Sequence, residues 1–317
     1  WALEAGDLPG QADLAWASSP CQDFSLAGGR AGLAGGRSSA FFGFWRLIEA
    51  LEAERRGPRV IVIENVVGLL TSHGGADFTA LCRALAGQGY RFGALEIDAA
   101  HFLPQSRPRV FVIATKEAPD PRLTGDSPFQ TRAVRAAADR LPTDLAGLWI
   151  DWSLPAPPPQ NQDLAAVLEP DEAVAWNAPA ATERLLSLMA PLHRQRLEAR
   201  RRGGQRSVGA IYRRTREHIQ RPEARFDGLA GCLRTPRGGS SRQTLVVIDG
   251  GQVRTRLISP REGARLMGLP EAYRLPATTT GAFQVVGDGV AVPAVRWLAR
   301  ALIEPLLSAP PRVLAAE

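Results

Sequence analysis

Short apolar runs alternate with amphipathic segments through the first 117 residues. The runs lie at 13–18, 59–63 and 109–114, and the last two are rich in Val and Ile. Continuous apolar runs of this length are typical of strands buried on both faces, so the last two are expected to be parallel strands. Helical periodicity fills the intervals at about 39–55 and 76–87. This alternation predicts βαβ units and therefore an α/β fold with a doubly wound sheet.

The pattern changes after residue 117. Prolines cluster at 155–159, which is typical of a linker or an extended segment. The remaining expected elements are an extended segment at about 90–97, a helix at about 180–202, strands at about 244–248 and 253–257, a helix beginning near Pro260 and a last helix over 293–307.

Charge is concentrated in one part of the chain. The 317 residues carry a net charge of +6, and Lys116 is the only lysine. Residues 193–242 contain fourteen arginines and four acids. Arginine forms bidentate contacts with phosphate and guanine, so this stretch favours a polyanionic partner. No apolar run is long enough to span a bilayer, and we expect no membrane partner.

The three cysteines, Cys21, Cys82 and Cys232, are far apart in the sequence. No Cys-x-x-Cys pair exists, so we expect no metal site and a reduced, cytosolic environment. Cys82 falls within a helical pattern and is expected in the core, and Cys232 is also expected to be a packing residue.

Cys21 directly follows an apolar run and a proline, at the rim of the expected sheet. Open α/β folds keep their chemistry at this rim. The following residues, 22–36, are polar and rich in glycine, a composition that suits a mobile active-site loop. From these residues alone, an inert packing cysteine and a nucleophile are both open, and a nucleophile would need a nearby cation such as Arg107 or Arg109 to lower its pKa.

Glu64 ends a strand whose other residues are apolar. A buried acid is costly unless it is paired or functional. It could cap the next helix, or it could be a proton donor in a dry pocket. Arg107 and Arg109 alternate along an incoming strand and should therefore face opposite sides.

Five motifs in chain order resemble the cytosine-5 DNA methyltransferase family, and together they span nearly the whole chain. They are Pro20-Cys21-Gln22 with Phe24-Ser25, Glu64-Asn65-Val66, Gln105-x-Arg107-x-Arg109, the segment from Arg256 to Glu262 with Leu266-Met267-Gly268, and Gly287-Asp288-Gly289-Val290 with Pro293.

The resemblance implies a covalent mechanism. The Cys21 thiolate would add to carbon 6 of a cytosine flipped out of duplex DNA, and carbon 5 would then take a methyl group from S-adenosylmethionine. Glu64 would hydrogen-bond and protonate ring nitrogen 3. Arg109 would hold the carbonyl oxygen at ring position 2, and Arg107 would support the site or the loop that carries Cys21.

The resemblance also implies a cofactor site for S-adenosylmethionine, with contacts from Asp7, Pro20, Ser39, Asp288 and Val290. The family's first glycine-rich strand and the acid-ending strand after it are not in this sequence. We therefore expect an S-adenosylmethionine-dependent methyltransferase (Rossmann-like) sheet that is incomplete at its N-terminal side. The missing strands would belong to a longer chain or to a second chain, or else the protein is a degenerate remnant.

By position, the resemblance implies a smaller DNA target-recognition domain. We expect the catalytic domain at 1–117, the linker and target-recognition domain at 118–250, a return to the catalytic domain at 251–307, and a tail at 308–317. The expected DNA contacts are Gln22, Ser25, Arg214, Arg216, Thr235, Arg237, Gly239, Ser240 and Arg242.

The leading hypothesis is thus a DNA cytosine-5 methyltransferase of a bacterial restriction–modification system or of a phage, in the bacterial cytoplasm or associated with the nucleoid. A tRNA cytosine-5 methyltransferase is the second hypothesis, because a related branch shares the Pro-Cys and Glu-Asn-Val motifs. The long basic insert favours duplex DNA over tRNA. A non-catalytic DNA-binding remnant is the third.

Overall fold

The structure is a computed structural model that describes residues 3–18, 40–216, 219–235 and 242–308. It divides into two compact units. Unit 1 comprises residues 1–97, 108–156 and 297–317, and unit 2 comprises residues 98–107 and 157–296.

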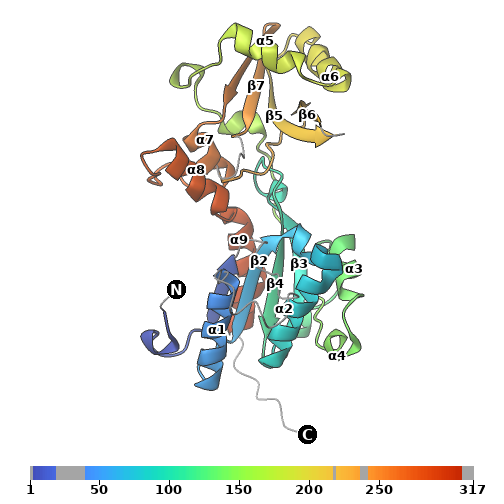
Figure 1. The fold of residues 1–317 in the computed structure, drawn as a ribbon, viewed down its shortest axis with the longest axis vertical. Coiled ribbons are helices and arrows are strands. Elements are labelled where there is room, and N and C mark those ends of the chain that lie inside the picture. Colours follow the sequence, from blue (N-terminus) through green and yellow to red (C-terminus); the bar gives the residue numbers. More distant parts are fainter. Residues whose placement is uncertain (1–2, 19–39, 217–218, 236–241, 309–317) are drawn as a thin grey trace. The chain divides into compact units, whose positions relative to one another are not determined.

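Unit 1 is built on a four-stranded sheet in the order β1-β2-β4-β3 (Figure 1). Strand β1 is parallel to β2, and Ser18 at its end pairs with Glu64. Both strands therefore finish at the same edge of the sheet. The strands are β1 (Leu14–Ser18), β2 (Val60–Val66), β3 (Arg91–Asp98) and β4 (Pro108–Thr115).

Strands β2 and β4 are antiparallel, with Glu64 opposite Phe111 and Val66 opposite Arg109. The expectation that both were parallel strands was therefore wrong for this pair. Their apolar runs report burial on both faces, because successive residues of β4 from Val110 to Thr115 are all buried although they alternate between the two faces. Burial alone does not fix the direction of a strand.

Helices α1 (Ala40–Ala53) and α2 (Ala76–Gly87) confirm the two helical segments expected from the periodicity. Both helices contribute to one core cluster with Ile61 and Ile63 of β2. Cys82 is fully buried in this cluster, and desolvation raises the pKa of its thiol, so the prediction of a core cysteine is confirmed. Glu64 and Arg109 alternate with the core-facing residues of their strands and thus lie on the opposite face of the sheet.

The segment after β4 remains in unit 1 as far as residue 156. It holds α3 (Arg132–Ala138) and α4 (Thr143–Ala146), and its Trp152 is fully buried and donates from Nε1 to the Ile113 carbonyl at 3.1 Å. The compact unit therefore extends past the boundary expected at residue 117.

Unit 2 contains a second, antiparallel sheet in the order β6-β5-β7-β8. The strands β7 and β8 confirm the two expected there, whereas β5 and β6 had no counterpart in the sequence prediction. The strands are β5 (Ser207–Arg216), β6 (Ile219–Arg225), β7 (Thr244–Asp249) and β8 (Gln252–Leu257). Because β8 pairs with β7, residues 251–296 belong with unit 2, and the chain rejoins unit 1 only at residue 297.

The single helix expected at 180–202 is in fact two helices, α5 (Pro179–Ser187) and α6 (Pro191–Arg202). Pro191 begins α6 because a proline lacks the N–H that would continue the preceding helix. The later helices are α7 (Pro260–Leu266), α8 (Thr279–Asp288), α9 (Val292–Leu298), a π-helical turn at Ala299–Ile303 and α10 (Glu304–Ser308).

Candidate active site and DNA interface

Glu64 and Arg109 form an ion pair at the edge where β1 and β2 end. Arg109 Nε lies 3.0 Å from Glu64 Oε1, and both side chains are largely buried. The pair is diagonal across the β2–β4 ladder, since Arg109 faces Val66 two residues beyond Glu64. A buried carboxylate and a guanidinium side by side can each engage a different polar edge of one planar base.

Several of the predicted site residues lie outside the described residues. They are Pro20, Cys21, Gln22, Ser25, Ser39, Arg237, Gly239 and Ser240. The chain leaves β1 at Ser18, three residues before Cys21.

Arg107 is buried within unit 2. Its Nη1 donates to the Leu233 carbonyl at 2.9 Å, and its Nη2 donates to the carbonyls of Gly287 at 3.0 Å and Gly289 at 2.7 Å. Nη1 also lies 3.2 Å from Cys232 Sγ. These contacts commit the two Nη groups to holding backbone segments of unit 2 together. Support of the site or of the loop that carries Cys21 stays a prediction for Arg107.

Asp288 and Thr235, predicted separately as a cofactor residue and a DNA residue, touch one another. The Thr235 hydroxyl donates to Asp288 Oδ1. The turn at 287–290 joins two helices: Gly287 and Asp288 end α8, Gly289 caps it, and α9 begins at Val292. The sequence prediction missed α8.

Gly287 permits this close approach. A Cβ at this position would lie 2.5 Å from the Thr235 backbone nitrogen and 2.8 Å from the Arg234 carbonyl carbon. Backbone atoms cannot move aside as a flexible side chain can, so only glycine fits. The segments that carry Thr235 and Asp288 are thus held together by Gly287 and Arg107.

The described cofactor candidates have donor and acceptor chemistry that fits S-adenosylmethionine in part. Asp7 is exposed in a 3₁₀ turn, and its Oδ2 accepts from the Glu4 amide at 2.8 Å, leaving capacity for a further donor. Asp288 is a second carboxylate, and Val290 adds apolar surface. Taken singly, each carboxylate could accept from an amino group of this cofactor, and Val290 could contact an uncharged part.

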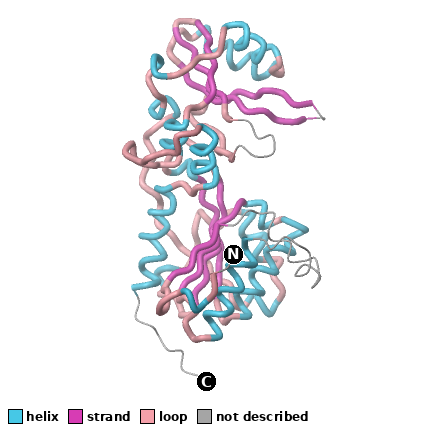
Figure 2. Tube along the Cα trace, turned by 60° about the vertical axis from the view of Figure 1, so that its left-hand side comes forward, coloured by secondary structure: helices cyan, strands magenta, loops and turns pink. Residues whose placement is uncertain are grey.

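Strands β5 and β6 continue as a two-stranded ribbon beyond the body of their sheet. β7 pairs with β5 only through Ile211, whereas β6 pairs with it through Arg216. Figure 2 shows this pair extending away from the other strands of unit 2. Arg213, Arg214 and Arg221 are exposed on the ribbon, and so is the apolar side chain of Ile219. The major groove of DNA accommodates a ribbon of this kind.

Arg214 is held in place by its neighbours on the ribbon. Its guanidinium lies over the Tyr212 ring at 5.0 Å, and Nε is 3.8 Å from Oε2 of Glu223, a buried acid. Glu223 Oε2 is also 3.8 Å from His193 Nε2 of α6. The backbone of Arg216 lies in β5, and Arg242 lies over the Phe283 ring at 5.7 Å. Glu223 and His193 gave no signal in the sequence beyond their charge.

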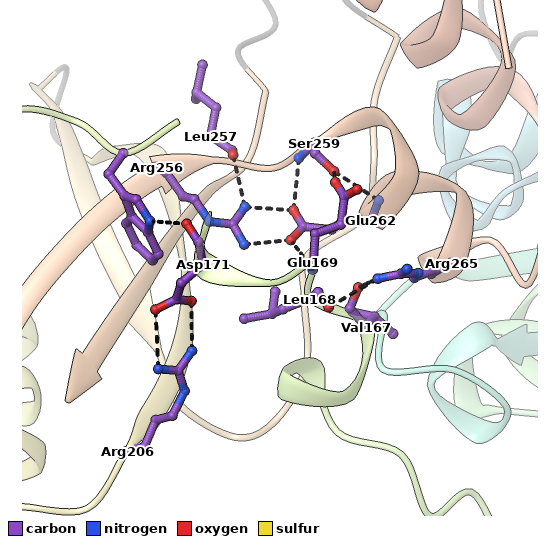
Figure 3. Close-up of polar contacts among 11 residues, drawn as sticks. Val167, Leu168, Glu169, Asp171, Arg206, Arg256, Leu257, Ser259, Glu262 and Arg265 are labelled. Carbon is purple, nitrogen blue, oxygen red and sulfur yellow. Dashed lines mark hydrogen bonds and ion pairs between the residues drawn. The ribbon is translucent and has the colours of Figure 1, made fainter. Parts of the chain in front are cut away.

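A buried ionic network links β8 to the start of α7 in unit 2 (Figure 3). Arg256 and Glu262 are both almost fully buried and form a bidentate pair, with Nη1 2.7 Å from Oε2 and Nη2 2.5 Å from Oε1. Glu262 Oε2 also accepts from the Ser259 amide at 2.9 Å, completing a capping box. Nearby, Asp171 pairs with Arg206 and Arg254, and Trp176 stacks on Arg254 at 4.0 Å.

The titration of Glu262 reflects this environment. Burial pushes the pKa of its carboxyl upward, but hydrogen bonds from Arg256 and from the Ser259 and Glu169 amides outweigh burial, so the pKa lies below its ordinary value. Hydrogen bonding by Arg206, followed by Arg254, likewise lowers the pKa of Asp171. The motif from Arg256 to Glu262 thus has a structural basis that the sequence alone did not reveal.

No group of three or more His, Cys, Asp or Glu side chains suited to a metal ion occurs in the described part of the chain. Within the same residues, every helix is too short or too polar to cross a membrane.

Comparison with known proteins identifies the family of the chain. The model of the C-5 cytosine-specific DNA methylase family matches residues 2–304. The chain belongs to this family. It is 24% identical over 305 residues to the type II methyltransferase M1.ScrFI of Lactococcus lactis subsp. cremoris, covering 96% of this chain and 65% of that protein. It is 29% identical over 319 residues to the DNA-cytosine methyltransferase of Escherichia coli K12, covering 92% and 60% respectively. This methylase-family chain therefore spans less than two thirds of the length of these relatives.

Solved structures agree on the fold. The Dnmt2 methyltransferase of S. pombe aligns with a TM-score of 0.56 at 18% identity, covering 96% of this chain and 82% of that one. This likeness and the family membership confirm the expected α/β methyltransferase fold.

Proposed function

We propose that the protein transfers a methyl group to carbon 5 of cytosine in duplex DNA through a covalent adduct with Cys21. The observation that carries the proposal is the pairing of Ser18 with Glu64 at the end of β1. Cys21 follows this strand end by three residues in the sequence, and three residues of chain span at most about 11 Å, which supports a shared site with the Glu64–Arg109 pair.

Each residue has a distinct task in this proposal. The Cys21 thiolate adds to carbon 6 of the ring, forming a carbon–sulfur bond. Glu64 hydrogen-bonds ring nitrogen 3 and donates a proton there as negative charge develops. Arg109 keeps Glu64 oriented and holds the carbonyl oxygen at ring position 2. Once carbon 5 carries the methyl group, its proton passes to water, the carbon–sulfur bond breaks to release the Cys21 thiolate, and the proton at ring nitrogen 3 returns to Glu64.

S-adenosylmethionine supplies the electrophilic methyl group when it is bound. The two carboxylates of Asp7 and Asp288 would accept from its amino groups, and Val290 would contact its apolar part. Pro20 and Ser39 complete the set implied by the resemblance. Arg107 and Gly287 would keep the turn that bears Asp288 in position.

The β5–β6 ribbon would bind the DNA through Arg214 and Arg216, and Thr235 and Arg242, outside the ribbon, would add further contacts. Gln22, Ser25, Arg237, Gly239 and Ser240 remain predicted contacts from the resemblance. The exposed arginines of the ribbon favour a nucleic acid, and the length of the basic insert favours duplex DNA over tRNA. A base inside a duplex is inaccessible, so the cytosine must be flipped out of the stack. A restriction–modification role in the bacterial cytoplasm is part of this proposal.

The proposal also includes further strands that would pair with the outer edge of β1. Among the described strands, β1 is at the end of the sheet, and its Leu14 is 36% exposed. Further cofactor-binding strands would pair along this edge, supplied either by the same polypeptide or by a second chain.

A covalent trap tests the proposal. The chain is incubated with S-adenosylmethionine and a long duplex in which 5-fluorocytosine replaces cytosine, because fluorine at carbon 5 blocks the final elimination. A denaturing gel should show a DNA-linked band that Cys21→Ser abolishes. Absence of the band with this chain, together with its appearance when additional strands are supplied, would favour a split or longer enzyme. Absence in both cases would favour a non-catalytic DNA-binding protein.

A further inference from the structure

Helix α6 carries an arginine-rich surface that none of the motifs includes. Arg194, Arg196, Arg200, Arg201 and Arg202 are all exposed on it. His193 and Leu197 are buried and fix which side of the helix packs against β6 and β7. Exposed arginines therefore lie on two flanks of the helix, one on each side of this buried face.

One flank faces β6. Arg200 lies over the Phe226 ring at 6.0 Å, just beyond the end of β6. Arg196 precedes it by four residues and so lies on the same side, about 6 Å away along the helix axis. The His193 Nδ1 contacts the Ala224 backbone of β6, within 3.0 Å of the carbonyl oxygen, which ties this flank to the edge strand.

The charges of this flank are not neutralised. Within the described residues, neither Arg196 nor Arg200 has a carboxylate within ion-pair distance. In contrast, several other arginines of the surrounding unit have a carboxylate partner. These are Arg201, Arg206, Arg214, Arg225, Arg254, Arg256 and Arg265.

The other flank of α6 has a different character. Arg194 and Arg201 line a cavity of about 510 Å³ together with Glu183 and Glu198. Arg201 lies 3.7 Å from Glu198 and donates from Nε to the Gly251 carbonyl at 2.8 Å. This flank therefore balances its own charge.

The unpaired flank is continuous with the ribbon. Ile211 packs in the same cluster as Leu197, so this face of β5 is the one that α6 covers. Arg213 lies two residues further along β5 and thus on the same face, beyond the N-terminal end of α6. A ribbon seated in a groove would bring the neighbouring phosphates towards Arg196 and Arg200.

We propose that the α6 flank formed by Arg196 and Arg200 binds the phosphate backbone of duplex DNA next to the segment that the ribbon reads. This inference rests on the proposed function only in taking DNA as the partner. Contacts to phosphate fix orientation and add affinity that does not depend on sequence.

The test compares two double variants of the full chain that remove equal charge from the same helix. R196Q/R200Q changes the proposed flank, and R194Q/R201Q is the matched control. Fluorescence anisotropy measures affinity for a labelled mixed-sequence duplex from 50 to 200 mM salt. A plot of log K against log[salt] has a negative slope, and each lost phosphate contact makes that slope shallower by about 0.9. R196Q/R200Q should therefore make it shallower by about 1.8. Across this range the wild type should therefore lose about tenfold more affinity than the variant does.

The control variant should keep the wild-type slope, and circular dichroism should show that both variants are folded. Equal slopes for all three proteins, or equal reductions in both variants, would overturn the inference. The proposed function would survive that result if the wild type still binds the duplex and forms the Cys21 adduct. A wild type that does not bind duplex DNA at all would instead overturn both.

Discussion

Arg109 reaches Glu64 diagonally across two antiparallel strands, with Nε 3.0 Å from Oε1. The partnership fixes the carboxyl group at the edge where the chain towards Cys21 leaves β1. Glu64→Gln keeps the shape and a hydrogen-bond donor but cannot deliver the proton. We expect methyl transfer, measured with labelled S-adenosylmethionine, to fall by about 10²–10⁴-fold.

DNA affinity is the control for this variant, because Glu64 lies away from the ribbon in sequence and contacts Arg109 rather than a basic surface residue. We expect binding of the duplex to change little. Undiminished turnover by Glu64→Gln would remove Glu64 from the proton-transfer step.

The next prediction concerns Gly287, which lies where the segment of Asp288, a cofactor candidate, meets the segment of Thr235, a DNA-contact candidate. Gly287→Ala would drive a methyl group into the backbone at Arg234 and Thr235. We expect a loss of about 1–3 kcal/mol of unfolding free energy in denaturant titrations, as for other overpacked sites. Gly147→Ala is the control, because a Cβ there meets no atom within 4 Å and the two proteins should then differ clearly. Equal stability of the two variants would contradict the close approach.

The buried pair of Arg256 and Glu262 predicts a large effect on stability. Glu262→Gln would leave the guanidinium buried without a countercharge, and we expect a loss of about 3–5 kcal/mol. R256M/E262L removes both charges and should cost clearly less than that. A double variant as unstable as the single one would mean that packing, and not charge balance, sets the cost.

The same carboxyl group predicts how stability depends on pH. The pKa of Glu262 in the folded protein is below the ordinary value of 4.5. Above pH 4.5, the ionised carboxyl group therefore makes its full contribution to the free energy of unfolding. This contribution is lost as the pH falls through the folded-state pKa, because protonation then favours the unfolded chain. Thermal unfolding should therefore show a constant midpoint from neutral pH down to the ordinary carboxyl range and a decline below it. The decline should be shallower in R256M/E262L.

The elements that could be predicted from the sequence are those that leave a pattern among neighbouring residues. The apolar runs located β2 and β4, and the periodicity located α1 and α2, because burial on one or both faces leaves a direct trace in residue order. Strand direction was wrong for β2 and β4, since both faces are apolar whichever way β4 runs. Pro191 was present in the sequence, yet the helical periodicity on both sides of it concealed the break between α5 and α6.

The site could be predicted only in part, for the same physical reason. Glu64 and Arg109 were predicted from motif order, and their mutual contact then followed from the sheet. The role of Arg107 depends on carbonyls 126 to 182 residues away, at Leu233, Gly287 and Gly289, which no local pattern reports. The ribbon was missed because its arginines suppress the alternation of apolar and polar residues that marks a strand.

Glu223 gives the last prediction, since it is a buried acid beneath an exposed arginine. Its carboxylate lies 3.8 Å from Arg214, which is one of the proposed DNA contacts of the ribbon. Arg214→Gln and Glu223→Gln should each weaken DNA binding, but the double variant should be no weaker than Arg214→Gln alone. This non-additivity is the signature of a residue that acts through another. Anisotropy titrations of the four proteins measure the coupling, and additive losses would show that Glu223 affects binding by a separate route.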